Sequence, residues 1–255
     1  MKIQQFTNAT IVVDTKESVI LVDPMLGPKG SMPPFTLFRF KPRKNPLVSV
    51  PDICKPTLDR VTHCLITHKH PDHIDKAAER YLIERNTPVT CSTLDERTFR
   101  KKGMNVVQTV DYWEKVDFLG GKIEGIPARH GYGFIAKPAG NVMGFYIELP
   151  NEPSLYISSD TIYTEDVKKV FREYRPNVSL VAAGSAQFDV FKPLLMTMED
   201  VVKFAQDAPG KVIANHLEAV NHCPTTRKQL VQKFASAGIK GKCFVPNDGE
   251  WMGFN

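Results

Sequence analysis

With 255 residues, 42% of them hydrophobic and 24% charged, the chain is long enough and apolar enough to bury a core. Its formal net charge of +5 is spread along the sequence, which falls short of the basic patch typical of nucleic-acid binding, so no nucleic-acid partner is expected. Five scattered cysteines without a C-x-x-C pair, no signal-peptide core and no apolar window of membrane-span length indicate a cytoplasmic protein without a membrane partner.

The N-terminal part predicts short strands followed by a long irregular segment. Strands are expected at 2–6, 10–13 and 19–22, separated by turn-forming residues. From 24 to about 57, eight prolines interrupt any helical or strand period. The apolar side chains of this Pro-rich loop indicate that it packs over something. It is either a lid that contacts the substrate or a loop that covers a sheet edge.

A β-rich run at 61–67 leads directly into the motif His68-Lys69-His70-Pro71-Asp72-His73. Imidazole nitrogen and carboxylate oxygen are ligands that zinc, iron and manganese accept. His68 and His70 are two residues apart on an extended segment, so they can point to the same side. Pro71 fixes a turn that lets Asp72 and His73 face a second point nearby. The motif therefore predicts half of a two-metal site at the carboxyl end of a strand.

Strands and helices alternate through the rest of the chain. Strands are predicted at 88–91, 106–110, 115–118, 122–127, 142–149, 155–159, 178–183, 211–215 and 242–245, with a glycine-rich loop at 131–140. Helices are predicted at 74–84, 92–103, 164–174, 197–207 and 226–236, with capping boxes at Ser92-x-x-Asp95 and Thr197-x-x-Asp200. Two successive β-then-α halves predict an α/β fold, a four-layer αββα sandwich of two mixed sheets with helices outside, as one domain over 1–255.

Three more potential ligands lie at or just past the ends of predicted strands: His130, Asp160 and His216. Each alone would be a weak signal, because a histidine or aspartate in a loop is usually solvated. Their shared placement with the first motif lets one end of the sandwich gather all seven side chains, which favours a metal site.

The order of these residues resembles the metallo-β-lactamase superfamily over essentially the whole chain: H-x-H-x-D-H after a strand, then His130, Asp160 and His216. Asp23-Pro24, the Ser-Ser-Asp-Thr run at 158–161 and Asn-His-Leu-Glu at 215–218 are most similar to the branch that includes the ascorbate-6-phosphate lactonases. The resemblance implies first-metal ligands His68, His70 and His130, second-metal ligands Asp72, His73 and His216, and the bridging ligand Asp160.

Such a site is typical of a metal-dependent hydrolase. Two cations that share a water lower its pKa, so a metal-bridging hydroxide can attack a small ester, lactone or phosphoester at pH 7. Catalytic roles are expected for Asp160, which balances the charge of two cations, and for Asp72, which can orient the nucleophile or pass on a proton. Zinc is the expected metal, with manganese or iron as alternatives. Alternative functions are a phosphodiesterase or nuclease, an iron-dependent oxidoreductase, and a metal-holding scaffold without activity.

The expected partner is a small-molecule substrate. It would be anionic if the basic residues of the Pro-rich loop contact it, namely Arg39, Lys41, Arg43 and Lys44. Polar residues close to the ligands are candidates for substrate contact or ligand support, although such residues are often only solvated: Lys69, Arg129, Tyr132, Tyr163, Glu218, Asn221 and His222. His222 is the strongest of them, because it lies six residues past His216 on a predicted loop.

Overall fold

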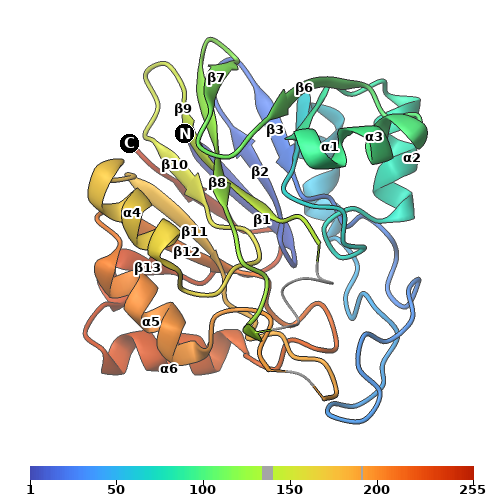
Figure 1. Cartoon of the computed structure of the whole chain (residues 1–255). Helices are drawn as coiled ribbons and strands as arrows, with labels where there is room; N and C mark the ends of the chain where they lie inside the picture. The colour runs from blue at the N-terminus through green and yellow to red at the C-terminus, as the bar shows by residue number, and fades with distance from the viewer. Residues whose placement is uncertain (134–139, 191) are drawn as a thin grey trace.

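The computed structural model describes residues 1–133, 140–190 and 192–255. Two mixed β-sheets pack face to face and helices lie on their outer sides (Figure 1), which confirms the predicted αββα sandwich. Within the described residues each sheet has seven strands, in the orders β14-β1-β2-β3-β4-β5-β6 and β13-β12-β11-β10-β9-β8-β7. Among these residues, no helix is both long and apolar enough to cross a membrane.

The first sheet takes its strands from the N-terminal half and from the end of the chain. They are β1 (Lys2–Thr7), β2 (Thr10–Asp14), β3 (Val19–Val22), β4 (His63–Ile66), β5 (Val89–Ser92), β6 (Val106–Val110) and β14 (Trp251–Gly253). Its helical segments are η1 (Asp52–Cys54), α1 (Lys55–Asp59), α2 (Lys76–Glu84) and α3 (Thr93–Lys101). Strands β3 to β6 are parallel, so the loop after β4 leaves the sheet at the edge where β3 and β5 also end.

The second sheet is built from the C-terminal half. Its strands are β7 (Lys115–Phe118), β8 (Gly121–Pro127), β9 (Met143–Glu148), β10 (Leu155–Ile157), β11 (Val178–Ala182), β12 (Lys211–Asn215) and β13 (Cys243–Phe244). Its helical segments are α4 (Glu165–Glu173), α5 (Met198–Asp207), α6 (Arg227–Ser236) and η3 (Lys240–Lys242). The capping box that was predicted at Thr197 and Asp200 is confirmed at the start of α5.

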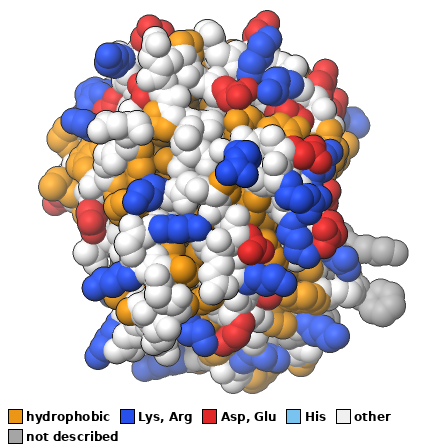
Figure 2. Space-filling model, turned by 90° about the vertical axis from the view of Figure 1, so that its left-hand side faces the viewer, with side chains coloured by type: hydrophobic (Ala, Val, Ile, Leu, Met, Phe, Trp, Pro, Cys, Tyr) orange, Lys and Arg blue, Asp and Glu red, His pale blue; other side chains and the backbone are white. Residues whose placement is uncertain are grey.

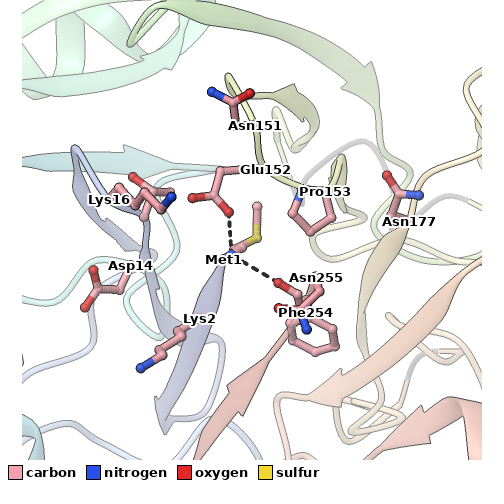
Figure 3. Close-up of a pocket in the computed structure, with 11 residues that line it drawn as sticks. Met1, Lys2, Asp14, Lys16, Asn151, Glu152, Pro153, Asn177, Phe254 and Asn255 are labelled. Carbon is pink, nitrogen blue, oxygen red and sulfur yellow. Dashed lines mark hydrogen bonds and ion pairs between the residues drawn. The ribbon is translucent and has the colours of Figure 1, made fainter.

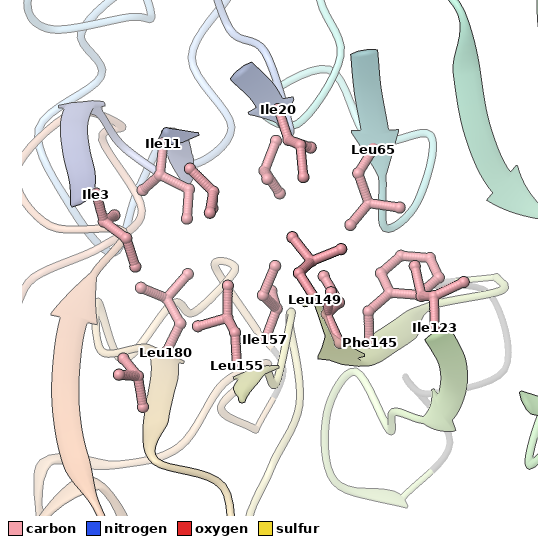
Figure 4. Packing of buried hydrophobic residues seen from close by; sticks show 14 of the residues in the cluster. Ile3, Ile11, Ile20, Leu65, Ile123, Phe145, Leu149, Leu155, Ile157 and Leu180 are labelled. Carbon is pink, nitrogen blue, oxygen red and sulfur yellow. The ribbon is translucent and has the colours of Figure 1, made fainter. Parts of the chain in front are cut away.

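The core lies between the two sheets. Figure 4 shows Ile3, Ile11 and Ile20 of the first sheet facing Ile157 and Leu180 of the second, and all of these side chains are buried. Removing this aliphatic surface from water is the main stabilising contribution, at about 25 cal/mol per Å² of apolar area. The strand period of two then orients the other side of each strand outward.

Strand β10 shows how this alternation builds the layers. Leu155 and Ile157 point into the core between the sheets, whereas Tyr156 points outward and packs with Val167 and Phe171 of α4. All three strand residues are buried, because one face meets a sheet and the other meets helices. The ends of such doubly covered strands are the places where polar side chains can still reach a cleft.

Charged side chains occupy the outer surface. Figure 2 shows the face on the left-hand side of Figure 1, where Lys and Arg side chains are scattered and interspersed with Asp and Glu. On this face positive charge does not form one continuous field of the kind that follows a nucleic-acid backbone.

The structure differs from the sequence prediction in the connection between β3 and β4 and at one edge of the first sheet. The predicted Pro-rich loop reached residue 57, but η1 and α1 already begin at Asp52 and Lys55. The prolines of this segment predicted a loop. Pro56, however, lies in the first turn of α1, where a backbone N–H would have no hydrogen-bond partner within the helix, so proline is tolerated there. Strand β14 was not predicted, because its three residues are too few to show a period; it pairs Met252 with Ile3 of β1.

The predicted capping box at Ser92 is wrong in one half. The Ser92 hydroxyl accepts a hydrogen bond from the Leu94 N–H, as a helix cap should. The Asp95 carboxylate does not return to Ser92, since it accepts a hydrogen bond from Asn141 Nδ2 and lies 3.3 Å from Lys69 Nζ. A tertiary contact has therefore taken the place of a local one. The predicted glycine-rich loop lies in large part outside the described residues.

Candidate metal centre

The predicted ligands come together at one end of the sandwich. They follow β4, β8, β10 and β12, so four loops from both sheets contribute to the site. Three overlapping groups have ligand atoms that all lie within 4.8 Å of one another, and together they contain all seven predicted ligands: His68, His70 and His130; His68, His73 and Asp160; Asp72, His73 and His216. The grouping of His68, His70 and His130 apart from Asp72, His73 and His216 matches the division that the resemblance implies.

Asp160 lies between these two groups. Its Oδ1 is 3.3 Å from His73 Nε2, and its Oδ2 is 3.6 Å from His130 Nε2 and 3.8 Å from His216 Nε2. The carboxylate is buried, so its two oxygens face imidazole nitrogens instead of water. One carboxylate in contact with ligands from both groups has the placement that a bridging ligand requires.

Two imidazoles of the first group, those of His68 and His130, are oriented through their Nδ1 atoms. Thr67 Oγ1 donates its proton to Asp23 Oδ2, so it accepts from Nδ1 of His68 at 3.0 Å. His130 Nδ1 donates to the Leu194 carbonyl, also at 3.0 Å. Since Nδ1 carries the proton in both rings, each Nε2 presents a free lone pair, which is the state a metal ligand needs.

The second group is held in the same way. His73 Nδ1 donates to Asp23 Oδ2 at 2.9 Å, and His216 Nδ1 lies 3.4 Å from Cys223 Sγ. Neither partner was found by sequence reasoning in this role. Asp23-Pro24 stood out only as part of the resemblance, and Cys223 only as one of five scattered thiols. Asp23 lies 50 residues before His73, and Cys223 lies seven residues after His216 in an irregular segment, so no strand or helix period connects either partner to its ligand.

The Nε2 atoms that face the centre of the site have no partner of their own. His68 Nε2, His73 Nε2, His216 Nε2 and Asp160 Oδ1 are all buried and make no hydrogen bond. A buried polar atom without a partner costs roughly 1–3 kcal/mol, so four at one point need an explanation. Divalent cations would satisfy all of them, because imidazole nitrogen and carboxylate oxygen are the donors they prefer. The residues present therefore fit a metal centre.

The charges of the site agree with this fit. Burial opposes a positive charge on His73, but the Asp160 and Asp23 carboxylates outweigh it and raise the pKa of His73 to about 10. Burial likewise opposes ionisation of Asp160, yet His73 and His216 hold the pKa of this carboxyl well below its usual value. In the metal-free protein a proton on His73 thus balances buried negative charge, a role that a bound cation would take over.

Asn8 connects the two halves of the site. Its side-chain Nδ2 donates to the Asp72 carbonyl at 2.9 Å, and its own carbonyl accepts from the His216 N–H at the same distance. Asn8 and His216 both have positive φ, of 50° and 59°, a conformation that asparagine tolerates better than most residues. The first hairpin therefore fixes the distance between a ligand loop of each sheet.

The Asp23 carboxylate leads to a first prediction. Asp23→Asn should lower the affinity for the second metal by about 10–100-fold, because the ligand His73 would lose the anion that orients its ring. Metal titration against a competing chelator measures this affinity. Asp14→Asn is the matched control, since Asp14 is paired with Arg60 at the surface. Equal metal affinity of wild type and Asp23→Asn would show that Asp23 only supports the fold.

Three of the residues proposed for substrate contact have other partners. The Tyr132 hydroxyl donates to Asp200 at 2.8 Å, the Tyr163 hydroxyl donates to Asp207, and Glu218 pairs with Arg227 at 2.7 Å. These polar groups are used within the helical layer and its loops. Lys69 lies 3.3 Å from Asp95. The recorded hydrogen bonds of Arg129 involve its backbone, whose N–H donates to Thr161 Oγ1 and whose carbonyl accepts from the Ile162 N–H.

Asn221 and His222 lie beside the Pro-rich loop. Asn221 Oδ1 accepts from the Phe35 N–H at 2.8 Å, and Asn221 Nδ2 donates to the Thr36 and Lys41 carbonyls. Arg39 of the same loop donates to Gln187 Oε1 and to the Asp189 carbonyl. The loop is therefore held against the segments that surround His222, and Arg39 is engaged in that attachment.

A cavity of about 790 Å³ lies apart from the predicted ligands. It is lined by Lys2, Lys16 and other residues near both chain ends (Figure 3), and none of the seven predicted ligands borders it. The Met1 amine contacts Glu152 and the Phe254 carbonyl there.

Fold and site together define a metallohydrolase architecture, and comparison with known proteins gives the family. The β-lactamase superfamily domain matches residues 19–216, so the chain belongs to this family. UPF0173 protein YddR of Bacillus subtilis is 31% identical over 252 residues, which is 98% of each chain.

Two solved structures are similar over nearly their whole length. A possible metal-dependent hydrolase from Veillonella parvula has a TM-score of 0.90 and 29% identity, covering 99% of this chain and 98% of that one. An isothiocyanate hydrolase from Delia radicum gut bacteria has a TM-score of 0.90 and 27% identity, covering 100% and 99%. The relatives thus share both the length and the fold of this chain.

Proposed function

We propose that the protein is a metal-dependent hydrolase that holds two divalent cations and acts on a small molecule. The observation that carries this proposal is the convergence of unpartnered, buried Nε2 atoms around Asp160. Similar proteins named metal-dependent hydrolases support the reaction class. Zinc is the expected cation, and the same donor atoms also suit manganese or iron.

The seven predicted ligands would bind two cations. His68, His70 and His130 would hold one cation, Asp72, His73 and His216 the other, and Asp160 would contact both. Two cations at such a site lower the pKa of a shared water toward neutrality and supply a nucleophile at pH 7.

Asp72 would orient the nucleophile or move a proton. Its Oδ2 lies 3.3 Å from His216 Nε2. Burial raises the pKa of Asp72, but the nearby His216 and His73 imidazoles outweigh this effect and lower it strongly. The carboxylate is therefore ionised, and it would hold a cation and orient a water.

The substrate would carry an electrophilic carbon or phosphorus next to a heteroatom. The sequence suggests an ester, a lactone or a phosphoester, with the lactone favoured by the likeness to ascorbate-6-phosphate lactonases. The similar isothiocyanate hydrolase adds the isothiocyanate group, whose electrophilic carbon lies between nitrogen and sulfur. All of these need the same activated water.

Metal analysis followed by a turnover panel tests the proposal. The purified protein should contain close to two zinc, manganese or iron ions per chain, and chelation should abolish turnover that added metal restores. The panel consists of benzyl isothiocyanate, a γ-lactone, bis(4-nitrophenyl) phosphate and a β-lactam. A protein that binds no transition metal, or whose turnover survives chelation, would contradict the proposal.

Asp72→Asn tests the proton-transfer role. At saturating metal, kcat should fall by about a hundredfold, the lower range for loss of a general acid or base. Asp166→Asn in the first turn of α4 is the control and should keep full turnover. Full metal occupancy together with full turnover in Asp72→Asn would dispose of the role.

A further inference from the structure

His222 is held between two aromatic rings next to the metal ligands. The Phe35 ring meets its edge at a centroid distance of 5.1 Å, and the Phe188 ring stacks on it at 5.7 Å. His222 is only 5% exposed. The next residue, Cys223, lies 3.4 Å from His216 Nδ1, so this segment runs directly along the second group of ligands.

The imidazole of His222 has no partner that accounts for its burial. Its Nδ1 is buried without a hydrogen bond, and neither ring nitrogen bonds to another residue that the structure describes. It also lies outside the three groups of potential metal ligands found among those residues. Buried polar side chains in native proteins nearly always have partners, so an imidazole without a recorded protein partner at either nitrogen, beside a candidate site, points to a ligand that pairs with one of them.

This imidazole is neutral at pH 7. Burial lowers the pKa of His222 to about 4; the nearby Asp72 and Asp160 carboxylates oppose this effect, and the charges of His216 and His130 reinforce it. A neutral ring has one N–H donor and one acceptor nitrogen. Because a buried N–H is left without a partner less readily than an acceptor, the proton is assigned to Nε2.

The two aromatic rings belong to segments that are tied together. The Asp189 carboxylate, next to Phe188, accepts hydrogen bonds from the backbone N–H groups of Leu37, Phe38 and Arg39. The Phe35 N–H is itself held by Asn221. The aromatic clamp, defined as Phe35, His222 and Phe188, is therefore fixed by hydrogen bonds on both sides and is formed before any ligand binds.

Room for a substrate lies next to the clamp. A cavity of about 590 Å³ is bordered by Phe35, Met32 and Ile74 and by the motif residues Lys69 and Pro71; of the clamp it is Phe35 that lines it, and none of the seven predicted ligands borders it. This volume falls within the range of small-molecule sites. Phe35 thus belongs to both the clamp and the cavity. Of the four cations that border the cavity, Lys69 is paired with Asp95 and Lys102 with Glu79, and the other two are Lys76 and Arg80.

We propose that His222 is a substrate-binding residue that donates a hydrogen bond to a heteroatom of an uncharged substrate, whose apolar substituent lies against Phe35 and Phe188. The proposal rests on the proposed hydrolase function and names its substrate class. It differs from the anionic substrate that the basic residues of the Pro-rich loop suggested, since Arg39 is engaged with Gln187 and Asp189.

Kinetics with the zinc-loaded full chain test the proposal. His222→Phe keeps an aromatic ring in the clamp but removes the hydrogen-bond donor. It should lower kcat/KM for benzyl isothiocyanate by about 10- to 100-fold. His222→Gln, which keeps an N–H donor, should recover most of this loss. Phe38→Ala is the control, because Phe38 lies on the same loop and is 88% exposed. Zinc content should be equal in all variants.

Substrate charge is tested with a matched pair. Benzyl isothiocyanate should be preferred over 4-carboxybenzyl isothiocyanate by wild type, and Phe35→Ala should reduce this preference. Preference for the carboxylated compound would overturn the proposal, as would unchanged kcat/KM in His222→Phe. Loss of zinc from His222→Phe would also overturn it, because His222 would then support the ligand His216.

Binding separates failure of this proposal from failure of the proposed function. Phenylacetamide, an uncharged probe with a hydrogen-bond acceptor, should bind to wild type and Phe38→Ala in ligand-observed NMR, and binding should be lost in His222→Phe. If zinc-loaded wild type turned over none of the panel compounds, the hydrolase function would fail while this result still upheld the role of His222. Equal binding to all three proteins would refute that role.

Discussion

Asp160→Asn should reduce turnover by about a thousandfold or more and leave fewer than two metal ions per chain. The substitution keeps the size of the side chain but removes the negative charge that lies between His73, His130 and His216. Two cations held close together repel each other, and the anion between them offsets several kcal/mol, each 1.4 kcal/mol being a factor of ten in rate. Metal content by mass spectrometry and kcat at saturating metal measure the two effects.

Asp166→Asn again provides the matched control, because Asp166 is an aspartate outside the site, in the first turn of α4. It should leave metal content and turnover unchanged. Two bound metals and wild-type turnover in Asp160→Asn would show that Asp160 is not a bridging ligand, and the placement of its oxygens among the imidazoles would then need another explanation.

His73→Ala should remove the second metal and leave the first in place. His73 Nε2 belongs with Asp72 and His216, and its Nδ1 is committed to Asp23, so the loss removes one of three ligands from that group. The first group keeps His68, His70 and His130. The variant should therefore retain about one metal per chain, and turnover should fall by two to three orders of magnitude because one cation no longer activates the water.

Stepwise metal titration of the apo protein follows this directly. Wild type should show two binding steps, and His73→Ala should lose the weaker one. His63→Ala is the control, since His63 lies at the start of β4 and is not part of any potential ligand group found in the described residues. Equal weakening of both steps in His73→Ala would mean that the ligands are divided between the metals in another way.

Most of the fold could be predicted from local patterns. Strands such as β11 and β12 appear as short β-branched runs, and helix α5 begins at a capping box, so their existence follows from the sequence period and from caps. Prediction failed where a tertiary contact decided the local structure. The three residues of β14 form a strand only because they pair with β1, and the Asp95 side chain accepts a hydrogen bond from Asn141 instead of capping the helix.

The sequence predicted the potential ligands of the candidate site but not the groups that orient them. Each of the seven potential ligands could be named, because histidine and aspartate at the ends of strands are visible one by one. The groups that orient them were not. The partners of His73, His130 and His216 are an aspartate, a backbone carbonyl and a thiol that no spacing connects to them: Asp23, Leu194 and Cys223.

The sequence by itself determined the αββα class, the four loops that carry potential ligands and the chemical type of the site, because strand period and donor chemistry are local properties. The tertiary structure decided which nitrogen of each imidazole faces the centre, that Asp160 lies between the two groups, and that His222 is enclosed by Phe35 and Phe188. These features depend on contacts between residues that local patterns do not connect, such as His73 with Asp160 and Asn221 with Phe35, and such contacts exist only once both sheets have packed.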